Sequence, residues 1–331
     1  MDVVAIVQTA YIGDVVLATP LLESARKSLP GWRVVAVVRA GCENVLGNNP
    51  FADEIVVWDK RGGEGGITGI AGMAARLRRL GLETAVVPHR SFRTGLAVLL
   101  AGARERIGFA KGGGVLFHTV RVPYRYGIHE VERNLMLASS AGWMSEGFRP
   151  MVFPDGGDRA TVERTLAGVR SFCAFAPGSV WPTKRWPAES YAEVGRHFAS
   201  GGLRVVVSGG GGDRETCARV AADVPGALDV SGMLTLRQSA ELYRRSLFVL
   251  TGDTAPQHLA AAMDARVFSL FGPTVREFGF WPYTERGVVI EEDEACRPCG
   301  AHGHSGCPNR THLCMRRITG MKVIQAIEAR L

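Results

Sequence analysis

The stretch Leu247–Thr274 constrains the fold more than any other part of the chain, because it contains a complete strand, turn, helix and second strand. The apolar run 247–250 is typical of a strand covered on both faces, and 267–271 is expected to form the next strand. Between them a Gly-Asp-Thr turn starts a helix, and Thr254 with Gln257 three residues later predicts a capping box. A helix that starts after a parallel strand exposes unpaired N–H groups, which favours either an anion site or an ordinary connection that binds nothing.

Both halves of the 331-residue chain repeat this pattern of strand, glycine-bearing turn and helix. The chain turns irregular between Phe148 and Gly157, where prolines and glycines favour a domain boundary. We therefore predict an α/β protein with two Rossmann-like αβα domains, residues 1–155 and 156–331, that face each other across a cleft. The glycine-rich segment 62–72 is expected to be a loop, and 320–331 a last helix that packs back across the domains. Further strands are predicted over 3–7, 33–38, 54–58, 84–87, 104–109, 172–175 and 204–208, and further helices over 15–29, 42–48, 74–80, 129–142, 188–200, 213–224 and 235–245.

The composition describes a soluble globular protein with anionic partners. Apolar residues make up 46% and charged residues 21% of the chain, the net charge is +7 at pH 7, and the pI is about 9.2. This balance favours nucleotides, phosphorylated glycans, acidic lipid headgroups or nucleic acid, and does not choose among them. Apolar runs such as 96–101 fall far short of the ~18 residues that span a bilayer, and no signal peptide precedes the first strand, so we expect a cytosolic protein.

Two turns in the first half carry candidate functional side chains at the carboxyl ends of predicted strands. Asp14 follows the first strand, where it either caps a helix or acts as a carboxylate that takes up a proton. The turn 89–93 (HRSFR) follows the fourth strand and is either a solvated surface or a phosphate clamp that uses Arg90 and Arg93.

Four of the seven cysteines lie in a glycine- and histidine-rich tail, CRPCGAHGHSGCPNRTHLC. Cysteines in a cytosolic chain point away from disulfides and, where clustered, toward a metal. Cys296, Cys299, Cys307 and Cys314 combine one CxxC pair with two further thiols, and three histidines lie nearby. We predict that these four cysteines form a structural tetrahedral zinc site, the alternative being a loop of reduced thiols without metal.

Several motifs, taken together, resemble the lipopolysaccharide heptosyltransferases, which form glycosyltransferase family 9 and have the two-domain GT-B architecture. The likeness covers nearly the whole chain and is greatest to the second heptosyltransferase. The motifs are Gly13-Asp14, PHRSFRT at 88–94, RIGF at 106–109, PGSVWPTKRWP at 177–187, TGDTAPQHLAAA at 251–262, FGPT at 271–274 and the cysteine-rich tail.

The resemblance implies an inverting transfer of heptose from ADP-heptose to the phosphorylated inner core of lipopolysaccharide. It places the acceptor in the amino-terminal domain and the donor in the carboxy-terminal domain, with Asp14 as the general base and Lys184 at the leaving ADP. It requires no cofactor for catalysis. The donor residues that it implies are Ser179, Lys184, Glu215 (with Asp213 as the alternative), Asp253, Thr254 and His258, and the acceptor residues are Gly13, Arg90 and Arg93.

The chemistry of the transfer agrees with these roles. Negative charge builds up on the departing diphosphate, and a helix N-terminus with Lys184 and His258 can offset it without a divalent metal. A lipid-linked acceptor further implies a cytoplasmic protein held peripherally at the inner face of the cytoplasmic membrane, where basic residues meet anionic lipid.

Two other classes of protein fit parts of the sequence. The first is another GT-B nucleotide-sugar enzyme, an epimerase or a different glycosyltransferase, which ADP or UDP binding would separate from the heptosyltransferase. The second is a zinc-bearing nucleic-acid-binding protein, which would concentrate its basic residues on one face. Here lysines and arginines are scattered among acidic residues, so we expect no nucleic-acid partner.

Overall fold

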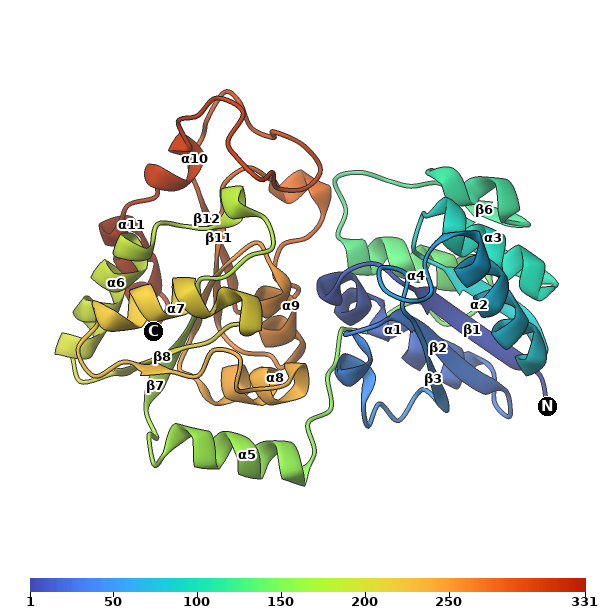
Figure 1. Cartoon of the computed structure of the whole chain (residues 1–331), viewed down its shortest axis with the longest axis horizontal. Helices are drawn as coiled ribbons and strands as arrows, with labels where there is room; N and C mark the ends of the chain where they lie inside the picture. The colour runs from blue at the N-terminus through green and yellow to red at the C-terminus, as the bar shows by residue number, and fades with distance from the viewer. The chain divides into compact units, whose positions relative to one another are not determined.

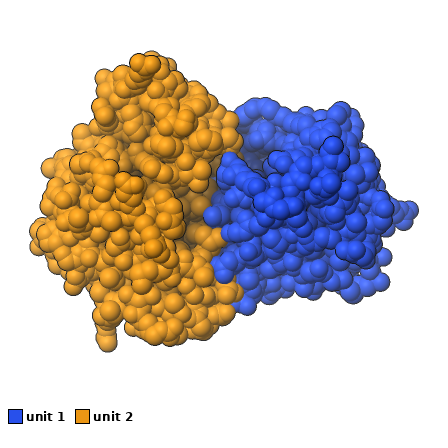
Figure 2. All heavy atoms as spheres, in the orientation of Figure 1, with its two compact units in different colours: residues 1–153 blue, residues 154–331 orange.

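The computed structural model describes all residues from 1 to 331 and divides into two compact units, Met1–Phe153 and Pro154–Leu331 (Figure 2). Each unit has one six-stranded parallel sheet with helices packed on it (Figure 1). This confirms the predicted α/β class with two Rossmann-like halves. None of the helices combines the length and the apolar character that crossing a membrane requires.

Unit 1 alternates strands with helices along the chain. Its elements are β1 Val3–Gln8, α1 Ile12–Ser28, β2 Arg33–Arg39, η1 Glu43–Leu46, β3 Glu54–Trp58, α2 Gly66–Leu80, β4 Leu82–Val87, α3 Phe92–Ala101, β5 Glu105–Phe109, η2 Gly113–Phe117, β6 Val120–Val122 and α4 Glu130–Ser140. The strands are all parallel, in the order β3-β2-β1-β4-β5-β6. Helix α1 packs beside α4, and α2 packs beside α3.

Unit 2 repeats the same plan. Its elements are α5 Gly156–Leu166, β7 Phe172–Ala176, η3 Pro182–Lys184, α6 Ala188–Ser200, β8 Arg204–Val207, η4 Gly211–Asp213, α7 Arg214–Ala222, β9 Leu228–Asp229, α8 Leu236–Arg245, β10 Val249–Gly252, α9 Ala255–Ala262, β11 Val267–Phe271, η5 Arg276–Phe278, β12 Gly287–Glu291, α10 Leu313–Arg316 and α11 Gly320–Glu328. The parallel order is β12-β11-β10-β7-β8-β9. Helix α6 packs on α7 and α11, and α8 packs on α5 and α9.

In both units the strand order reverses beside the first strand, between β1 and β4 and between β7 and β10. Open parallel sheets bind ligands at their carboxyl edge next to such a reversal, because the connections there leave toward opposite faces. The residues that follow β1 and β4 lie side by side for this reason, as do the residues that follow β7 and β10.

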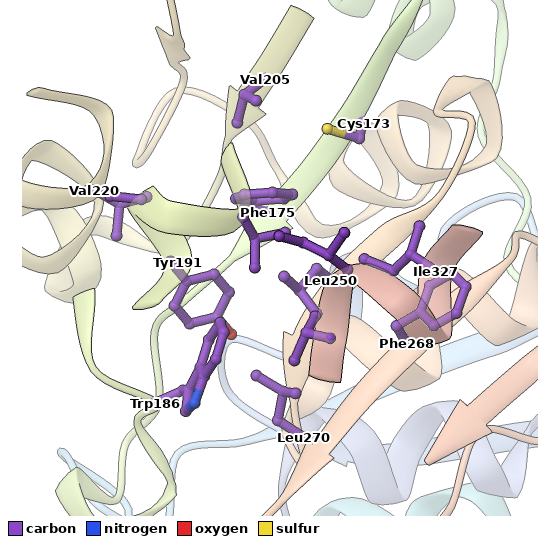
Figure 3. Close-up of a cluster of buried hydrophobic side chains, with 14 of the residues drawn as sticks. Cys173, Phe175, Trp186, Tyr191, Val205, Val220, Leu250, Phe268, Leu270 and Ile327 are labelled. Carbon is purple, nitrogen blue, oxygen red and sulfur yellow. The ribbon is translucent and has the colours of Figure 1, made fainter. Parts of the chain in front are cut away.

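The core of unit 2 anchors the connection that follows β7. Figure 3 shows Trp186 and Tyr191 beside Phe175 and Leu250 of the central strands. The Trp186 and Tyr191 rings meet edge to face at 5.0 Å, and Trp186 Nε1 donates to the backbone oxygen of Ile318 at 2.9 Å. Because Trp186 is buried two residues after Lys184, its packing restricts the backbone that carries the lysine.

The loop predicted over 62–72 is wrong for its second half, because residues 66–72 belong to α2. Gly69 explains why glycine occurs there. A Cβ at this position would lie 1.8 Å from the backbone oxygen of Glu64, so only glycine allows the helix to approach the preceding turn.

Other boundaries also differ from the predictions. Helix α1 begins at Ile12 rather than at residue 15, and β10 covers Val249–Gly252 rather than 247–250. The capping box predicted at Thr254 is wrong, since Thr254 is the N-cap of α9 but its side chain makes no capping hydrogen bond. Six strands and α-helices had no prediction, namely α3, β6, α5, β9, β12 and α10.

Candidate active site

The carboxyl edge of the unit 2 sheet holds a buried ion pair between Lys184 and Asp253. Lys184 lies at the end of η3, which follows β7, and Asp253 follows β10 directly. Lys184 Nζ donates to Asp253 Oδ2 at 2.5 Å and to the Asp253 backbone oxygen at 3.1 Å. The ammonium group carries three hydrogens, so these two contacts leave one N–H for a further acceptor.

Two more donors hold the Asp253 carboxylate. Thr274, which follows β11, donates its hydroxyl to Oδ2 at 2.7 Å, and Gln257 donates from Nε2 to Oδ1 at 2.9 Å. Burial disfavours the ionised carboxylate, but the Lys184 charge and these hydrogen bonds outweigh burial and hold the pKa of Asp253 below its ordinary value. The carboxylate is therefore ionised and fixed by three side chains from different elements.

Gln257 serves this cluster instead of capping α9. It is fully buried, and its Nε2 also donates to the backbone oxygen of Phe280 at 3.0 Å. The two amide hydrogens are thus used by Asp253 and Phe280, which fixes the orientation of the amide.

His258 lies next to this cluster as a neutral ring. It is buried in the first half of α9, and burial lowers its pKa to about 4, although Asp253 acts in the opposite direction. Its Nδ1 is buried without a hydrogen-bond partner in the protein. A buried ring nitrogen without a partner points to a ligand that supplies one. Because the ring is neutral at pH 7, His258 offers a hydrogen bond rather than a positive charge.

The other predicted donor residues lie around the same edge. Ser179 is buried in the turn after β7, where its Oγ accepts from Trp181 N at 3.1 Å. Asp213 lies close to Gly178, the residue before Ser179. A Cβ at Gly178 would meet the Asp213 carboxylate at 2.2 Å. Glu215 lies two residues further on, exposed on α7. The structure thus brings Asp213, rather than Glu215, next to the β7 turn.

The cysteine-rich tail fastens the connection that carries Lys184. His312 shares a hydrogen bond with the backbone oxygen of Thr183 at 2.7 Å, and His304 N donates to Thr183 Oγ1 at 2.7 Å. The tail also reaches the loop after β11, where Arg297 Nη2 donates to the backbone oxygen of Thr274 at 2.9 Å. The positions of Thr183 and Thr274, which neighbour the Lys184–Asp253 ion pair, are therefore held by hydrogen bonds to residues 297–312.

The predicted zinc site is not formed in the structure. No group of three or more histidine, cysteine, aspartate or glutamate side chains has an arrangement that could hold a metal ion. All seven cysteines are free thiols, and two of the nearby histidine rings are bonded to backbone oxygens instead, His312 to that of Thr183 and His304 to that of Cys299. Both alternatives for the tail, a zinc site and reduced thiols without metal, stay predictions. Cys299 donates to the backbone oxygen of Cys296, and Cys307 accepts from His312 N.

In unit 1, Asp14 lies at the carboxyl edge of the sheet. It occupies the first turn of α1, and its Oδ2 accepts from the backbone N–H of Tyr11 at 3.1 Å. Asp14 thus supports the helix start from inside the helix and is only half-buried, with Gly13 directly before it. Both interpretations of Asp14, cap and proton acceptor, are compatible with this position.

Basic residues surround that edge. Arg90 lies 4.2 Å from the centre of the Tyr124 ring, and Arg93 is exposed in the first turn of α3. Arg61 donates to Tyr11 Oη at 3.1 Å. Lysines and arginines from several connections therefore gather where β1, β3 and β4 end, which is typical of an anion-binding surface.

The sequence prediction missed three residues at this edge, Lys60, Thr9 and Thr94. All three are buried, and Lys60 Nζ donates to the two threonine hydroxyls. The sequence signal was available for Lys60, since a lysine that directly follows a predicted strand in an α/β fold lies at the ligand-binding edge.

Comparison with known proteins agrees with this arrangement. The family model described as glycosyltransferase family 9 (heptosyltransferase) matches residues 71–306. Lipopolysaccharide heptosyltransferase 1 of Pseudomonas aeruginosa is 26% identical over 313 residues, which cover 89% of this chain and 85% of the relative.

Two solved structures share the fold of nearly the whole chain. The glycosyl transferase family 9 protein of Veillonella parvula has a TM-score of 0.84 and 21% identity, covering 99% of this chain and 97% of its own. The E. coli ADP-heptose LPS heptosyltransferase II has a TM-score of 0.81 and 22% identity, covering 99% and 98%. These likenesses confirm the predicted GT-B fold class. Because relatives of both the first and the second type match, the greater likeness to the second enzyme stays a prediction. With more than two thirds of its length matched by the family model, the chain belongs to glycosyltransferase family 9, the heptosyltransferases, and is a glycosyltransferase.

Proposed function

We propose that the protein transfers heptose from ADP-heptose to the phosphorylated inner core of lipopolysaccharide, with inversion at the anomeric carbon. The names of the relatives support this substrate pair, since they include a lipopolysaccharide heptosyltransferase and an ADP-heptose LPS heptosyltransferase. The observation that carries the proposal is the cluster of Lys184, Asp253 and His258 at the strand reversal of unit 2. In this proposal unit 2 binds the donor and unit 1 binds the acceptor.

The leaving group receives its stabilisation from unit 2. As the bond from the anomeric carbon to the diphosphate breaks, ADP leaves with the electron pair and its negative charge increases. The Lys184–Asp253 pair is neutral as a whole, so the stabilisation comes from directed donors rather than from net charge. These donors are the third N–H of Lys184, the His258 ring and the N–H groups that begin α9.

The attacking group receives its activation from unit 1. The acceptor hydroxyl attacks the anomeric carbon from the face opposite the diphosphate, and Asp14 takes its proton as the new C–O bond forms. The Tyr11 N–H holds the carboxylate in its orientation until that step, and the positive end of α1 attracts its negative charge. Gly13 leaves room beside it, and Arg90 and Arg93 attract the phosphates of the acceptor.

Ser179, Thr254 and the acidic group near the β7 turn complete the donor side. Ser179 and Thr254 lie in the two turns that meet at the strand reversal, where the diphosphate would lie. For the ribose hydroxyls we propose Asp213 or Glu215, and the position of Asp213 beside Gly178 favours Asp213. We further propose a cytoplasmic protein that meets a membrane surface peripherally through basic residues while it acts on a lipid-linked acceptor.

One experiment tests the proposal directly. The protein is incubated with ADP-heptose and truncated core acceptors, and the products are identified by mass spectrometry. We expect one added heptose of inverted configuration, and a loss of about 10²-fold or more in kcat for Asp14→Asn, which keeps the size and the hydrogen bond at this position. ADP affinity should stay unchanged in that variant. Near-full turnover of Asp14→Asn would remove Asp14 from the mechanism, and absence of a heptosylated product would refute the substrate assignment.

A further inference from the structure

Four polar side chains form a buried network at the carboxyl edge of the unit 1 sheet. Lys60 Nζ donates to Thr9 Oγ1 at 2.5 Å and to Thr94 Oγ1 at 2.6 Å. His89 Nδ1 lies 2.9 Å from Thr9 Oγ1 and 3.1 Å from Thr94 Oγ1, and the two hydroxyl oxygens are 3.1 Å apart. The four residues follow β1, β3 and β4 or belong to α3, so the network joins the three connections at the strand reversal.

The charged groups that act on this network are all basic. Lys60 is 7% exposed, and its ammonium group lies 4.2 Å from the centre of the Trp58 ring. Burial, with the nearby charge of Arg93, lowers the pKa of Lys60 to about 7. Burial and then the charges of Lys60, Arg90 and Arg93 lower the pKa of His89 to about 3. The His89 ring is therefore neutral at physiological pH.

The acidic residues of this edge have partners of their own. Asp14 accepts from Tyr11 N, and the Asp59 carboxylate accepts from the backbone of Gly62 and Gly63. Glu130 is paired with Arg133, its nearest cation, at 2.7 Å. The hydrogen bonds of Lys60 go to threonine hydroxyls rather than to any of these carboxylates, so the protonated form of Lys60 is buried without a counterion in the protein.

Counting the hydrogens of the network assigns the tautomer of His89. Lys60 only donates, so each threonine oxygen accepts from it and keeps its own O–H to donate. If Thr94 donates to Thr9 and Thr9 donates to His89 Nδ1, every hydroxyl hydrogen has an acceptor. The lone pair of Nδ1 then faces the ammonium group, which is electrostatically favourable. The ring hydrogen consequently lies on Nε2.

His89 Nε2 has no hydrogen-bond partner in the protein. The residue is only half-buried and this nitrogen is not enclosed by the protein, so solvent reaches it. Its N–H therefore forms a fixed donor in a region where the positive charges of Arg90 and Arg93 act on the ring. A donor of fixed position near two guanidinium charges suits an oxygen of an ionised acid.

We propose that His89 binds a carboxylate or phosphate oxygen of an anionic ligand through its Nε2–H, and that Lys60 positions this donor through Thr9 and Thr94. The ligand would be an acidic group of the acceptor, which rests on the proposed assignment of the acceptor to unit 1. The bound anion supplies the counterion that Lys60 lacks. Binding should therefore favour the protonated lysine and be accompanied by proton uptake near and above neutral pH.

The first test observes the tautomer in the intact wild-type protein. Long-range ¹H–¹⁵N correlation spectra of protein labelled with ¹⁵N-histidine distinguish the two neutral tautomers, and His89→Gln identifies the His89 signals by their loss. We expect the Nε2–H form at neutral pH and a shift of its signals during titration with sodium sulfate. An Nδ1–H form, or a ring that titrates near its ordinary pKa, would overturn the inference.

The second test measures anion affinity by calorimetry with sulfate, whose charge is constant from about pH 6 to about pH 9. His89→Gln places an amide donor near the position of Nε2, whereas His89→Asn reaches only the position of Nδ1. We expect His89→Gln to bind sulfate within about threefold of the wild type, and His89→Asn to bind about tenfold more weakly. Equal affinity of His89→Asn and the wild type would overturn the assigned donor.

Lys60→Met tests the positioning role, because methionine fills a similar volume without a charge. We expect about tenfold weaker sulfate binding near pH 6.5 and loss of the proton uptake, which calorimetry measures in buffers of different ionisation enthalpy. Unchanged proton uptake would refute the role of Lys60. Acetate and inorganic phosphate, titrated in parallel, show whether the site prefers a carboxylate or a phosphate.

Urea unfolding followed by circular dichroism serves as the folding control for every variant, because ADP is assigned to unit 2 and its affinity does not report on the fold of unit 1. Two combinations of results separate this inference from the proposed function. Sulfate binding with the expected pattern but no heptosyl transfer would refute the function and keep the site. Asp14-dependent transfer with unchanged sulfate affinity in His89→Asn and Lys60→Met would keep the function and refute the site.

Discussion

Replacing Gln257 tests whether the polar cluster of unit 2 depends on this side chain. In Gln257→Met the fully buried residue keeps its approximate volume but loses both hydrogen bonds of Nε2. Losing the bond to the Asp253 carboxylate costs about 1.5–3 kcal/mol, and leaving the Phe280 oxygen without a donor costs about 1–3 kcal/mol. After the gain from burying a methionine, we expect a net loss of about 3 kcal/mol in the free energy of unfolding of unit 2.

Thr254→Ala is the matched control. If Thr254 and Gln257 formed a capping box, each substitution would cost about 1 kcal/mol. The structure predicts unequal effects instead, because the Thr254 side chain makes no capping hydrogen bond and its removal should cost less than about 0.5 kcal/mol.

The assay is urea unfolding followed by circular dichroism, together with ADP titration by calorimetry. Two-domain proteins commonly unfold in separate transitions, so the transition that ADP shifts identifies unit 2. We expect Gln257→Met to lower this transition and to weaken ADP binding about tenfold, since Asp253 and Lys184 lose their fixed geometry. Equal losses of about 1 kcal/mol in the two variants would refute the reasoning and restore the capping box.

Three further predictions concern the same unit. Lys184→Met should weaken ADP binding by about tenfold or more, measured by calorimetry, and unchanged affinity would remove Lys184 from the donor site. Thr183→Val removes the hydroxyl that binds the tail at His304. We expect several-fold weaker ADP binding with little loss of overall stability. Equal ADP affinity would show that the tail does not hold the Lys184 connection. Burial lowers the pKa of His258 from 6.5 to about 4, so the unfolded protein binds the proton more readily than the folded one. The contribution of neutral His258 to the free energy of unfolding is therefore fully present above about pH 6.5. It falls by up to about 3 kcal/mol as the pH decreases toward 4. Thermal unfolding as a function of pH measures this, and His258→Gln should flatten the profile; an equally steep profile in that variant would assign the effect to other groups.

The repeating architecture could be predicted from the sequence because strands buried on both faces are nearly continuous apolar runs. The strands 54–58 and 267–271 were predicted with the bounds that the structure has. Helix α3 was missed because its second half is apolar on all sides and shows no amphipathic period. Glycine misled the prediction at Gly69, where it permits close packing inside a helix rather than forming a loop.

The site could be predicted only in part, since position along the chain does not determine side-chain partners. The predicted residues Lys184, Asp253 and His258 do lie together, because β7 and β10 are neighbours in the sheet. The local sequence does not indicate that the Gln257 side chain forgoes a capping hydrogen bond with Thr254. Its orientation depends on a hydrogen bond to the backbone oxygen of Phe280, 23 residues later. The neutral state of His258 likewise depends on burial by distant residues. The roles of these residues in catalysis stay predictions.

The tail that fastens Thr183 also has a consequence for protein synthesis. The strands of unit 2 and the Lys184 connection leave the ribosome well before His304, His312 and Ile318, which hold that connection through Thr183 and Trp186. A nascent chain can therefore assemble its sheets while the Lys184 connection, the proposed nucleotide-binding loop, is still unsupported. The proposed capacity to capture the sugar nucleotide should accordingly arise only after the chain has been translated through Ile318.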